Sequence, residues 1–374
     1  MKKLTGSRLM VGIPNICADI LYVSRFKAAD PVVFLQHGRD KYLVVSRMET
    51  GRARAANPAL KILTPDELGL DRKRRWQVSH WAAALLKKTG VGKVDVAGTF
   101  PLGVARELEK QGLRVRLAQE ELCPERVVKT AGEIVHIRHA QRAAVKALHG
   151  ACALLEQARV DARGVLREGR QVLTSERVRQ VINRILLDEN CSGGEPIVAG
   201  GPLSANPHWI GHGPLKAGEP IVMDIFPQSL ETGYWGDLTR TVVKGAPSPA
   251  LVRMYQAVKK AQAEALASVR AGVRGVSIHQ GVIDRFTELG FESSVTKGVP
   301  EGFIHGTGHG VGLEIHEAPS LGFGGAILRV GQVVTIEPGL YYAEVGGIRI
   351  EDTVVVTREG FEFLATCPKQ LTIR

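Results

Sequence analysis

Residues 221–243 read IVMDIFPQSLETGYWGDLTRTVV, which places two aspartates, Asp224 and Asp237, in what otherwise reads as a pair of apolar strands. Burying an ionised carboxylate on a strand face is costly unless another group compensates its charge. The stretch therefore predicts a hairpin whose two acids share a compensating partner.

A second stretch repeats this pattern. Residues 333–356 read VVTIEPGLYYAEVGGIRIEDTVVV and carry Glu337 and Glu351. Antiparallel pairing across a short turn brings such acids onto one face of adjacent strands, where like charges repel unless a cation lies between them. Either pair alone is typical of solvent-facing acids, but the duplication favours a shared acidic site.

Each of these stretches follows a pair of expected helices. The four helices are expected at residues 132–157, 175–188, 249–270 and 278–289. Ser175 and Ser248 are the expected N-caps of the second and third, and Pro249 suits a first helical position. Two helix–helix–hairpin units that each contribute two carboxylates predict a domain with pseudo-twofold symmetry.

The first part of the chain alternates β-branched runs with helical ones. Strands are expected at residues 8–12, 31–35 and 41–46, and a helix at 77–88. This part shows no catalytic motif, and the pattern changes to long helices near residue 125. We therefore expect an α/β (α+β) protein with domains at 1–125 and 126–374.

The composition excludes several classes of protein. Hydrophobic residues make up 44% of the 374, enough for a core in each domain. No apolar run approaches the ~20 residues of a membrane span. The five cysteines form no C-x-x-C pair and are expected to be core thiols. We expect a cytoplasmic protein with no membrane partner.

The net charge is +11, and the run from Asp71 to Arg75 is locally very basic. Such a run can bind nucleic acid, but it is usually a solvated face, and aromatic residues are only 5% of the chain. We therefore predict no nucleic-acid partner. The surplus charge is equally consistent with small anionic substrates such as peptide carboxylates.

Between the two hairpins, residues 300–319 read PEGFIHGTGHGVGLEIHEAP, with His305, His309 and His316 among five glycines. The glycine spacing matches neither phosphate-binding loop pattern, and H-E-x-x-H is missing, which argues against a nucleotide site and a mononuclear zinc peptidase. Three histidines surrounded by glycine indicate backbone packed closely against a ligand.

Taken together, these motifs resemble the pita-bread metallopeptidases, which comprise methionine aminopeptidase, aminopeptidase P and prolidase, with creatinase as a metal-free relative. The resemblance is strong over residues 125–374 and weaker over the front part, which resembles the creatinase-like N-terminal domain of the proline-directed members. The metal-ligand pattern of the family falls on Asp224, Asp237, His309, Glu337 and Glu351.

The resemblance implies two divalent metal ions, with Asp237 and Glu351 as bridging ligands. Four carboxylates and one imidazole suit Mn²⁺ first, with Co²⁺, Fe²⁺ or Zn²⁺ as alternatives. Such ions lower the pKa of a bound water, which then attacks the scissile carbonyl. Glu337 matches the proton shuttle of the family. His316 matches the histidine that stabilises the tetrahedral oxyanion.

Three further residues match the substrate side of the family site. His305 matches a second substrate-side histidine, and Arg349 matches an arginine that either orients acidic groups or substrate or forms a structural ion pair. His208 resembles the histidine that contacts substrate near the scissile nitrogen, and His212 is its competitor.

Two departures from the family pattern affect the first hairpin. Twelve residues separate Asp224 from Asp237 where most members have ten, and Phe226 stands where glycine is frequent. Both departures leave the ligand types unchanged but alter the expected shape of the pocket.

The expected activity is hydrolysis of Xaa-Pro bonds in small peptides, foremost in Xaa-Pro dipeptides. The alternatives are an aminopeptidase P that releases the first residue of longer Xaa-Pro peptides, and a non-catalytic binding protein that keeps the fold. The family resemblance also implies a homodimer.

Overall fold

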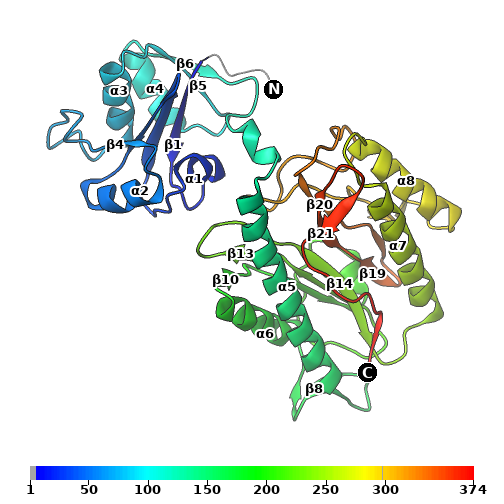
Figure 1. Ribbon diagram of the computed structural model, residues 1–374. Coiled ribbons are helices and arrows are strands. Elements are labelled where there is room, and N and C mark those ends of the chain that lie inside the picture. Colours follow the sequence, from blue (N-terminus) through cyan, green and yellow to red (C-terminus); the bar gives the residue numbers. More distant parts are fainter. Residues whose placement is uncertain (1–5, 297) are drawn as a thin grey trace. The chain divides into compact units, whose positions relative to one another are not determined.

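The structure is a computed structural model that describes residues 6–296 and 298–374. The chain forms two compact units, Met1–Arg126 and Val127–Arg374 (Figure 1).

The first unit is built on a six-stranded mixed sheet of order β4-β3-β2-β1-β5-β6. Its strands are β1 (Ser7–Gly12), β2 (Val32–His37), β3 (Asp40–Val44), β4 (Lys61–Leu63), β5 (Lys93–Val96) and β6 (Arg114–Leu117). Its helices are α1 (Ala18–Ser24), α2 (Thr50–Ala56), α3 (Val78–Lys88) and α4 (Leu102–Lys110).

Both faces of this sheet are covered, because successive strand residues point to opposite sides. Leu9 of β1 packs in one cluster with Leu85 of α3, whereas the next residue, Met10, packs in another cluster with Ile20 of α1. Leu9, Met10 and Val11 of β1 therefore contribute side chains to two hydrophobic clusters, one on each face of the sheet.

The second unit pairs four helices with short sheets that are antiparallel except for the parallel pair formed by β14 (Leu238–Lys244) and β22 (Thr372–Ile373). The helices are α5 (Ala131–Gln157), α6 (Ser175–Asp188), α7 (Pro249–Ser268) and α8 (Gly275–Glu288). In Figure 1, α5 and α6 lie to one side of the strands and α7 and α8 to the other. This arrangement is the helix–helix–hairpin duplication that the sequence predicts.

Three sheets carry the centre of this unit. The first has the order β11 (Ile197–Gly200), β12 (Ile221–Ile225), β14 (Leu238–Lys244), β22 (Thr372–Ile373). The second has the order β17 (Val333–Ile336), β20 (Asp352–Val356), β21 (Phe361–Phe363), and the third pairs β18 (Gly339–Tyr342) with β19 (Gly346–Arg349).

Short strands and one 3₁₀ helix lie at the periphery of the second unit. They are β7 (Arg159–Val160), β8 (Leu166–Glu168), β9 (Gln171–Val172), β10 (Cys191–Ser192), β13 (Gln228–Ser229), β15 (Ser294–Thr296), β16 (Val299–Glu301) and η3 (Gly201–Ala205). The β13 strand pairs with β10, so the long tip of the first hairpin is held against the segment that follows α6.

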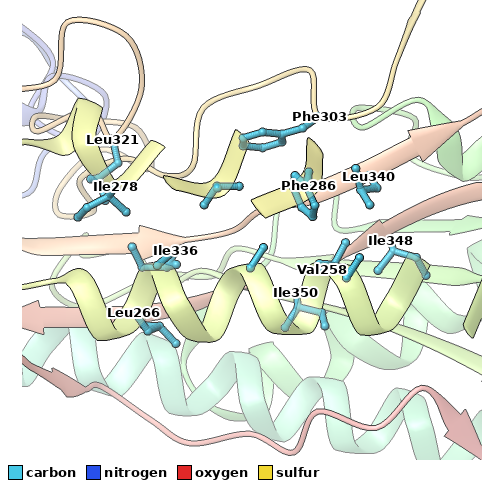
Figure 2. Close-up of a cluster of buried hydrophobic side chains, with 14 of the residues drawn as sticks. Val258, Leu266, Ile278, Phe286, Phe303, Leu321, Ile336, Leu340, Ile348 and Ile350 are labelled. Carbon is cyan, nitrogen blue, oxygen red and sulfur yellow. The ribbon is translucent and has the colours of Figure 1, made fainter. Parts of the chain in front are cut away.

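The apolar face of α7 fixes the second pair of sheets. Figure 2 shows Val258 and Leu266 of α7 directed toward Ile336, Ile348 and Ile350, in the cluster that also holds α8. The five side chains are at most 4% exposed. Burial on this scale contributes about 25 cal/mol per Å² of apolar surface, so α7 anchors the strands that carry the second acidic pair.

Helix capping confirms one prediction and corrects another. The Ser248 hydroxyl accepts the N–H of Leu251, and Pro249 is the first helical residue, as predicted. The prediction of Ser175 as an N-cap is wrong, because Thr174 has the extended backbone of a cap and its hydroxyl accepts the N–H of Arg177. Ser175 is already helical and buried.

All five cysteines are free thiols, and two of them, Cys123 and Cys191, are buried. Among the helices of residues 6–296 and 298–374, none has both the length and the apolar character that crossing a membrane requires.

Candidate metal centre

The first hairpin places its two aspartates diagonally on one face. Asp224 in β12 is directly opposite Thr239 in β14, and Asp237 lies two residues before Thr239. Because side chains alternate along a strand, Asp237, Thr239 and Asp224 share a face. The Gln141 amide on α5 fixes this end of β14, since it donates to the Asp237 carbonyl and accepts the Asp237 N–H, both at 2.8 Å.

The second hairpin is split into two ladders. Ile336 is paired with Asp352 in the β17–β20 ladder, whereas β18 pairs with β19 after the break at Pro338. Glu337 and Glu351 lie next to the Ile336–Asp352 pair, at the point where the ladders part. The sequence suggests one continuous strand pair from 333 to 356. In the structure this pair is interrupted at Glu337 and Glu351.

Thr239 joins the two hairpins. The Glu351 N–H donates to the Thr239 carbonyl at 3.1 Å, and the Thr239 hydroxyl donates to Glu351 Oε2 at 2.8 Å. This double contact brings Asp224, Asp237 and Glu351 together although they are far apart in the sequence.

The glycine-rich loop brings His309 to the same place. The His309 N–H donates to Thr335 Oγ1 at 3.0 Å, and the neighbouring Gly308 lies so close to β17 that a Cβ there would stand 2.0 Å from the Thr335 carbonyl oxygen. Only glycine permits this approach. On the ring, Nδ1 lies 3.1 Å from the Gly310 carbonyl and donates to it, so the Nε2 lone pair faces the acids.

The distances define one compact cluster. His309 Nε2 lies 3.3 Å from Glu337 Oε1 and 3.5 Å from Asp237 Oδ2. One ligand atom each from Asp237, His309 and Glu351 fall within 4.8 Å of one another. These residues, with Asp224 and Glu337, line a cavity of about 690 Å³.

The acids in this cavity resist ionising together. Burial, followed by the charges of neighbouring carboxylates, raises the pKa of Asp237 and of Glu351 well above the ordinary range. Burial raises the pKa of Glu337 to about 7. Burial, with the neighbouring His316, lowers the pKa of His309 to about 4, so its imidazole is neutral and free to act as a ligand.

Two carboxylate oxygens in the cavity are buried without a hydrogen-bond partner among the described residues, Asp224 Oδ1 and Glu351 Oε1. Buried polar atoms are rarely left unsatisfied. Orphaned oxygens, clustered acids with raised pKa values and an oriented neutral imidazole are what a site for a divalent cation requires. The residues present therefore fit a metal centre.

Arg349 has a structural role at the edge of this cluster. Its Nη2 donates to Asp224 Oδ2 at 2.7 Å, its Nε to Thr239 Oγ1 at 3.1 Å, and its Nη1 to the Tyr341 hydroxyl at 2.8 Å. The structure shows an ion pair between Arg349 and Asp224, which orients an acidic group of the cluster. A contact between Arg349 and substrate stays a prediction. All three guanidinium nitrogens are engaged.

The remaining predicted residues divide between the cavity and the surface. His208, His305 and His316 line the cavity, and the His316 ring packs edge-on against His309 with centroids 4.3 Å apart. His212 is not among the lining residues and lies instead 3.2 Å from Glu176. Of the two competing histidines, His208 is the one placed near the acids.

Sequence reasoning missed Tyr341. Its hydroxyl lies between Arg349 Nη1 and His305 Nε2, the latter at 2.9 Å, and His305 Nδ1 donates to the Gly306 carbonyl. Burial lowers the pKa of His305 to about 3, and the Arg349 charge adds to this effect. His305 is thus a neutral ring in a fixed tautomer. Tyr341 lies on β18, in the ladder with β19, and reaches the site through its contacts with Arg349 and His305.

Phe226 confirms that the first hairpin shapes the pocket, because its side chain lines the cavity. The longer turn pairs Gln228 with Trp235 in an isolated bridge, and Trp235 Nε1 donates to the Leu313 carbonyl at 3.2 Å. The turn therefore contacts the loop that carries His309 and His316.

Comparison with known proteins identifies the family. The sequence pattern of metallopeptidase family M24 matches residues 135–358, which is more than half of the chain and includes all five predicted ligands. The chain belongs to metallopeptidase family M24. The members of this family are described as metallopeptidases.

Individual relatives in family M24 agree with this assignment. An uncharacterized peptidase of Bacillus subtilis is 40% identical over 179 residues, 47% of this chain and 48% of its own, so the chain matches about half the length of that relative. An Xaa-Pro dipeptidase of Pyrococcus horikoshii is 28% identical over 291 residues, 75% of each chain.

A solved structure extends the likeness over the whole chain. The Xaa-Pro dipeptidase of Bacillus anthracis superposes with a TM-score of 0.84 at 25% identity and covers 99% of this chain and 95% of its own. The pita-bread fold predicted for the second unit is confirmed.

Proposed function

We propose that this M24 member hydrolyses Xaa-Pro dipeptides at a centre of two divalent metal ions held by Asp224, Asp237, His309, Glu337 and Glu351. The observation that carries the proposal is the convergence of these five side chains in one cavity, with two buried carboxylate oxygens unpartnered among the described residues. Relatives named Xaa-Pro dipeptidase in both comparisons support the substrate class.

The donor set favours Mn²⁺, with Co²⁺, Fe²⁺ and Zn²⁺ as alternatives, because four carboxylates and one imidazole are hard or borderline ligands. When bound, such ions lower the pKa of a coordinated water and polarise the scissile carbonyl. Asp237 and Glu351, which approach from the two hairpins, would hold the ions together with Asp224, His309 and Glu337.

The chain's own residues supply positioning and proton transfer. Glu337 lies at the edge of the cluster, 3.3 Å from His309 Nε2, where its carboxylate can carry a proton between the attacking water and the leaving nitrogen. His316 borders His309 on the open side of the cavity and is proposed to donate to the developing oxyanion. His208 and His305 would contact the peptide.

Selectivity for proline must arise without a hydrogen bond from the scissile peptide nitrogen. A bond to proline has no N–H, so the site cannot depend on that donor and must recognise the ring and the ends of the peptide. Arg349 is the single arginine or lysine among the described residues that line the cavity, and its three hydrogen bonds use three of its five N–H groups. We therefore assign the proline carboxylate to the other N–H groups of Arg349 and to the ring of His208.

The decisive assay compares kcat/KM for Xaa-Pro dipeptides, Xaa-Ala dipeptides and Xaa-Pro-Xaa tripeptides with added Mn²⁺ or Co²⁺. We expect the Xaa-Pro dipeptides to be cleaved fastest. Equal or faster cleavage of the tripeptides would instead identify an aminopeptidase P. Metal binding without cleavage of any peptide would leave a non-catalytic binding protein.

We also propose a cytoplasmic homodimer. Five free thiols suit a reducing compartment, and the family resemblance supports the dimer. Sedimentation that shows monomer alone at micromolar concentration would exclude the dimer.

A further inference from the structure

The two units carry very different charge. Residues 1–126 contain 23 lysines and arginines against 13 aspartates and glutamates, a formal net charge of +10, whereas residues 127–374 contain 26 against 25, a net charge of +1. Nearly all of the surplus charge therefore belongs to the unit without the metal centre. A concentrated positive field raises the local concentration of anions.

The first unit also contains a cleft of about 650 Å³, lined by α3, α4 and residues of the loop before α3. One face of α3 forms a wall, with His80, Ala83, Ala84, Lys87 and Lys88 at helical spacings of three and four. The two alanines leave the space open, and the two lysines stand at the C-terminal end of the helix. The cleft is a feature of one unit and is separate from the metal centre.

The opposite rim carries Arg74 on a structured loop. Asp71 Oδ1 accepts the N–H groups of Lys73 and Arg74, both at 2.9 Å. The Trp81 indole on α3 donates to the Arg75 carbonyl at 2.8 Å. These contacts tie the loop to the helix, so Arg74 is presented to the cleft by an ordered backbone.

Cations outnumber acids in the cleft. Glu107 is the single acid among the described lining residues, and its Oε1 accepts a hydrogen bond from Gln111 Nε2 at 2.8 Å. Lys87 Nζ donates a hydrogen bond to Gln111 Oε1 at 3.0 Å. His80 Nδ1 is buried without a hydrogen-bond partner in the part of the chain that the structure describes. Arg74 also lies 3.8 Å from Asp71, which does not line the cleft. Among the described lining residues themselves, the three cations Arg74, Lys87 and Lys88 exceed the one acid.

We propose that this cleft binds a small anion that carries at least two linked phosphates, such as a nucleoside polyphosphate. Its volume lies within the range of small-molecule sites. Arginine and lysine are the side chains that recognise phosphate oxygens. Leu68, Leu70 and Ala84 add a small apolar surface to the lining. A lone carboxylate would leave most of these cations uncompensated.

The binding test uses the full-length metal-loaded protein and isothermal titration calorimetry at 150 mM salt, where long-range attraction is screened. Magnesium complexes of ATP and of pyrophosphate are titrated, with adenosine as the uncharged comparison. We expect saturable binding of one ATP per chain and no binding of adenosine. Pyrophosphate that binds as tightly as ATP would show that the phosphates alone are recognised. Adenosine that binds as tightly as ATP, or no saturable binding of either phosphate compound, would overturn the proposal.

Matched variants locate the site. The triple variant Arg74→Gln, Lys87→Gln, Lys88→Gln should weaken ATP binding at least tenfold, because it removes the proposed charge-assisted contacts. The control triple variant Arg39→Gln, Lys93→Gln, Arg114→Gln removes three exposed cations of the same unit from outside the cleft. It should change affinity less than about threefold, since only the screened field is altered.

A third variant, Ala84→Trp, fills the cleft without changing the charge and should abolish binding. Circular dichroism and peptidase activity establish that each variant is folded. Equal weakening of ATP binding by the two triple variants would mean that the positive field of the whole unit attracts the ligand. It would overturn the proposal that the cleft is the binding site. If a single-stranded oligonucleotide binds more tightly than ATP, and if its binding persists in the Ala84→Trp variant, the basic residues form a nucleic-acid surface instead.

Discussion

Lys129 and Glu317 form a buried ion pair, with Nζ and Oε1 2.6 Å apart and side chains 1% and 8% exposed. Lys129 lies just before α5, and Glu317 directly follows His316. The Glu317 carboxylate also fills the space beside Gly312, where an added Cβ would stand 2.4 Å from Oε1. The pair therefore anchors the loop on which the proposed oxyanion donor stands.

Replacing Lys129 with Met should destabilise the protein by about 3–5 kcal/mol, because it removes the ammonium group that lies 2.6 Å from the buried Glu317 carboxylate. Urea unfolding monitored by circular dichroism measures this change. The double variant Lys129→Met, Glu317→Gln should recover part of the loss. As a matched control, Lys146→Met breaks the more exposed pair with Glu189, and it should cost less than about 1 kcal/mol. Equal losses for the two single variants would contradict the role of burial.

Replacing Asp237 with Ala should remove metal and activity together. A proposed ligand carboxylate is lost, and Asp224, Glu337 and Glu351 remain to repel one another. Metal content after dialysis, measured by atomic spectroscopy, should fall well below that of the wild type while the far-UV spectrum persists. A variant with wild-type metal content and turnover would refute the ligand assignment.

Replacing His316 with Ala should separate binding of metal from catalysis. We expect unchanged metal content and a kcat lowered roughly 10²–10³-fold, the range for loss of one oxyanion donor. His212→Ala is the matched control, because His212 faces Glu176 and does not line the cavity. Its kcat should stay within about twofold of the wild type. A similar loss in both variants would mean that His316 acts through general stability.

Several features of the fold could be predicted because they have local causes. The helix that begins at Pro249 follows from its cap and its apolar face, and the β12–β14 hairpin follows from apolar runs on both sides of a turn. Thr174 and Ser175 are both good caps, so the sequence alone could not decide which one stands outside the helix. The backbone angles decide it.

The residues of the candidate site also divide into those that the sequence could predict and those that it could not. Its five predicted ligands follow from a family resemblance and converge in the structure, although their roles as ligands remain a prediction. Thr239 could have been found, because it lies two residues after Asp237 on the same strand face. Gln141 and Tyr341 could not, since they lie on separate elements and meet the site through tertiary packing.

The metal-free protein should be more stable at about pH 6.5 than at pH 8. The folded-state pKa of Glu337 is about 7, above its ordinary 4.5, and those of Asp237 and Glu351 are raised as well. For these three acids the folded state holds protons that the unfolded state has lost, so their contribution to stability falls as pH rises from the unfolded pKa values through the folded ones. Each such proton contributes about 1.4 kcal/mol per pH unit. The lowered pKa values of His305 and His309 act in the opposite direction below their ordinary 6.5, so the fall in stability should be clearest above about pH 6.5.

Urea unfolding after chelation and dialysis, at half-unit steps from pH 5 to pH 8, measures this slope. Glu337→Gln removes one titrating group without changing the shape of the side chain, so its metal-free slope should be shallower. Bound Mn²⁺ should reverse the trend, because cation binding requires ionised carboxylates and so stabilises the fold more as pH rises. A metal-free protein whose stability is constant or increases from about pH 6.5 to pH 8 would show that Asp237, Glu337 and Glu351 are compensated by the protein alone, and the argument for a metal centre would lose its electrostatic basis.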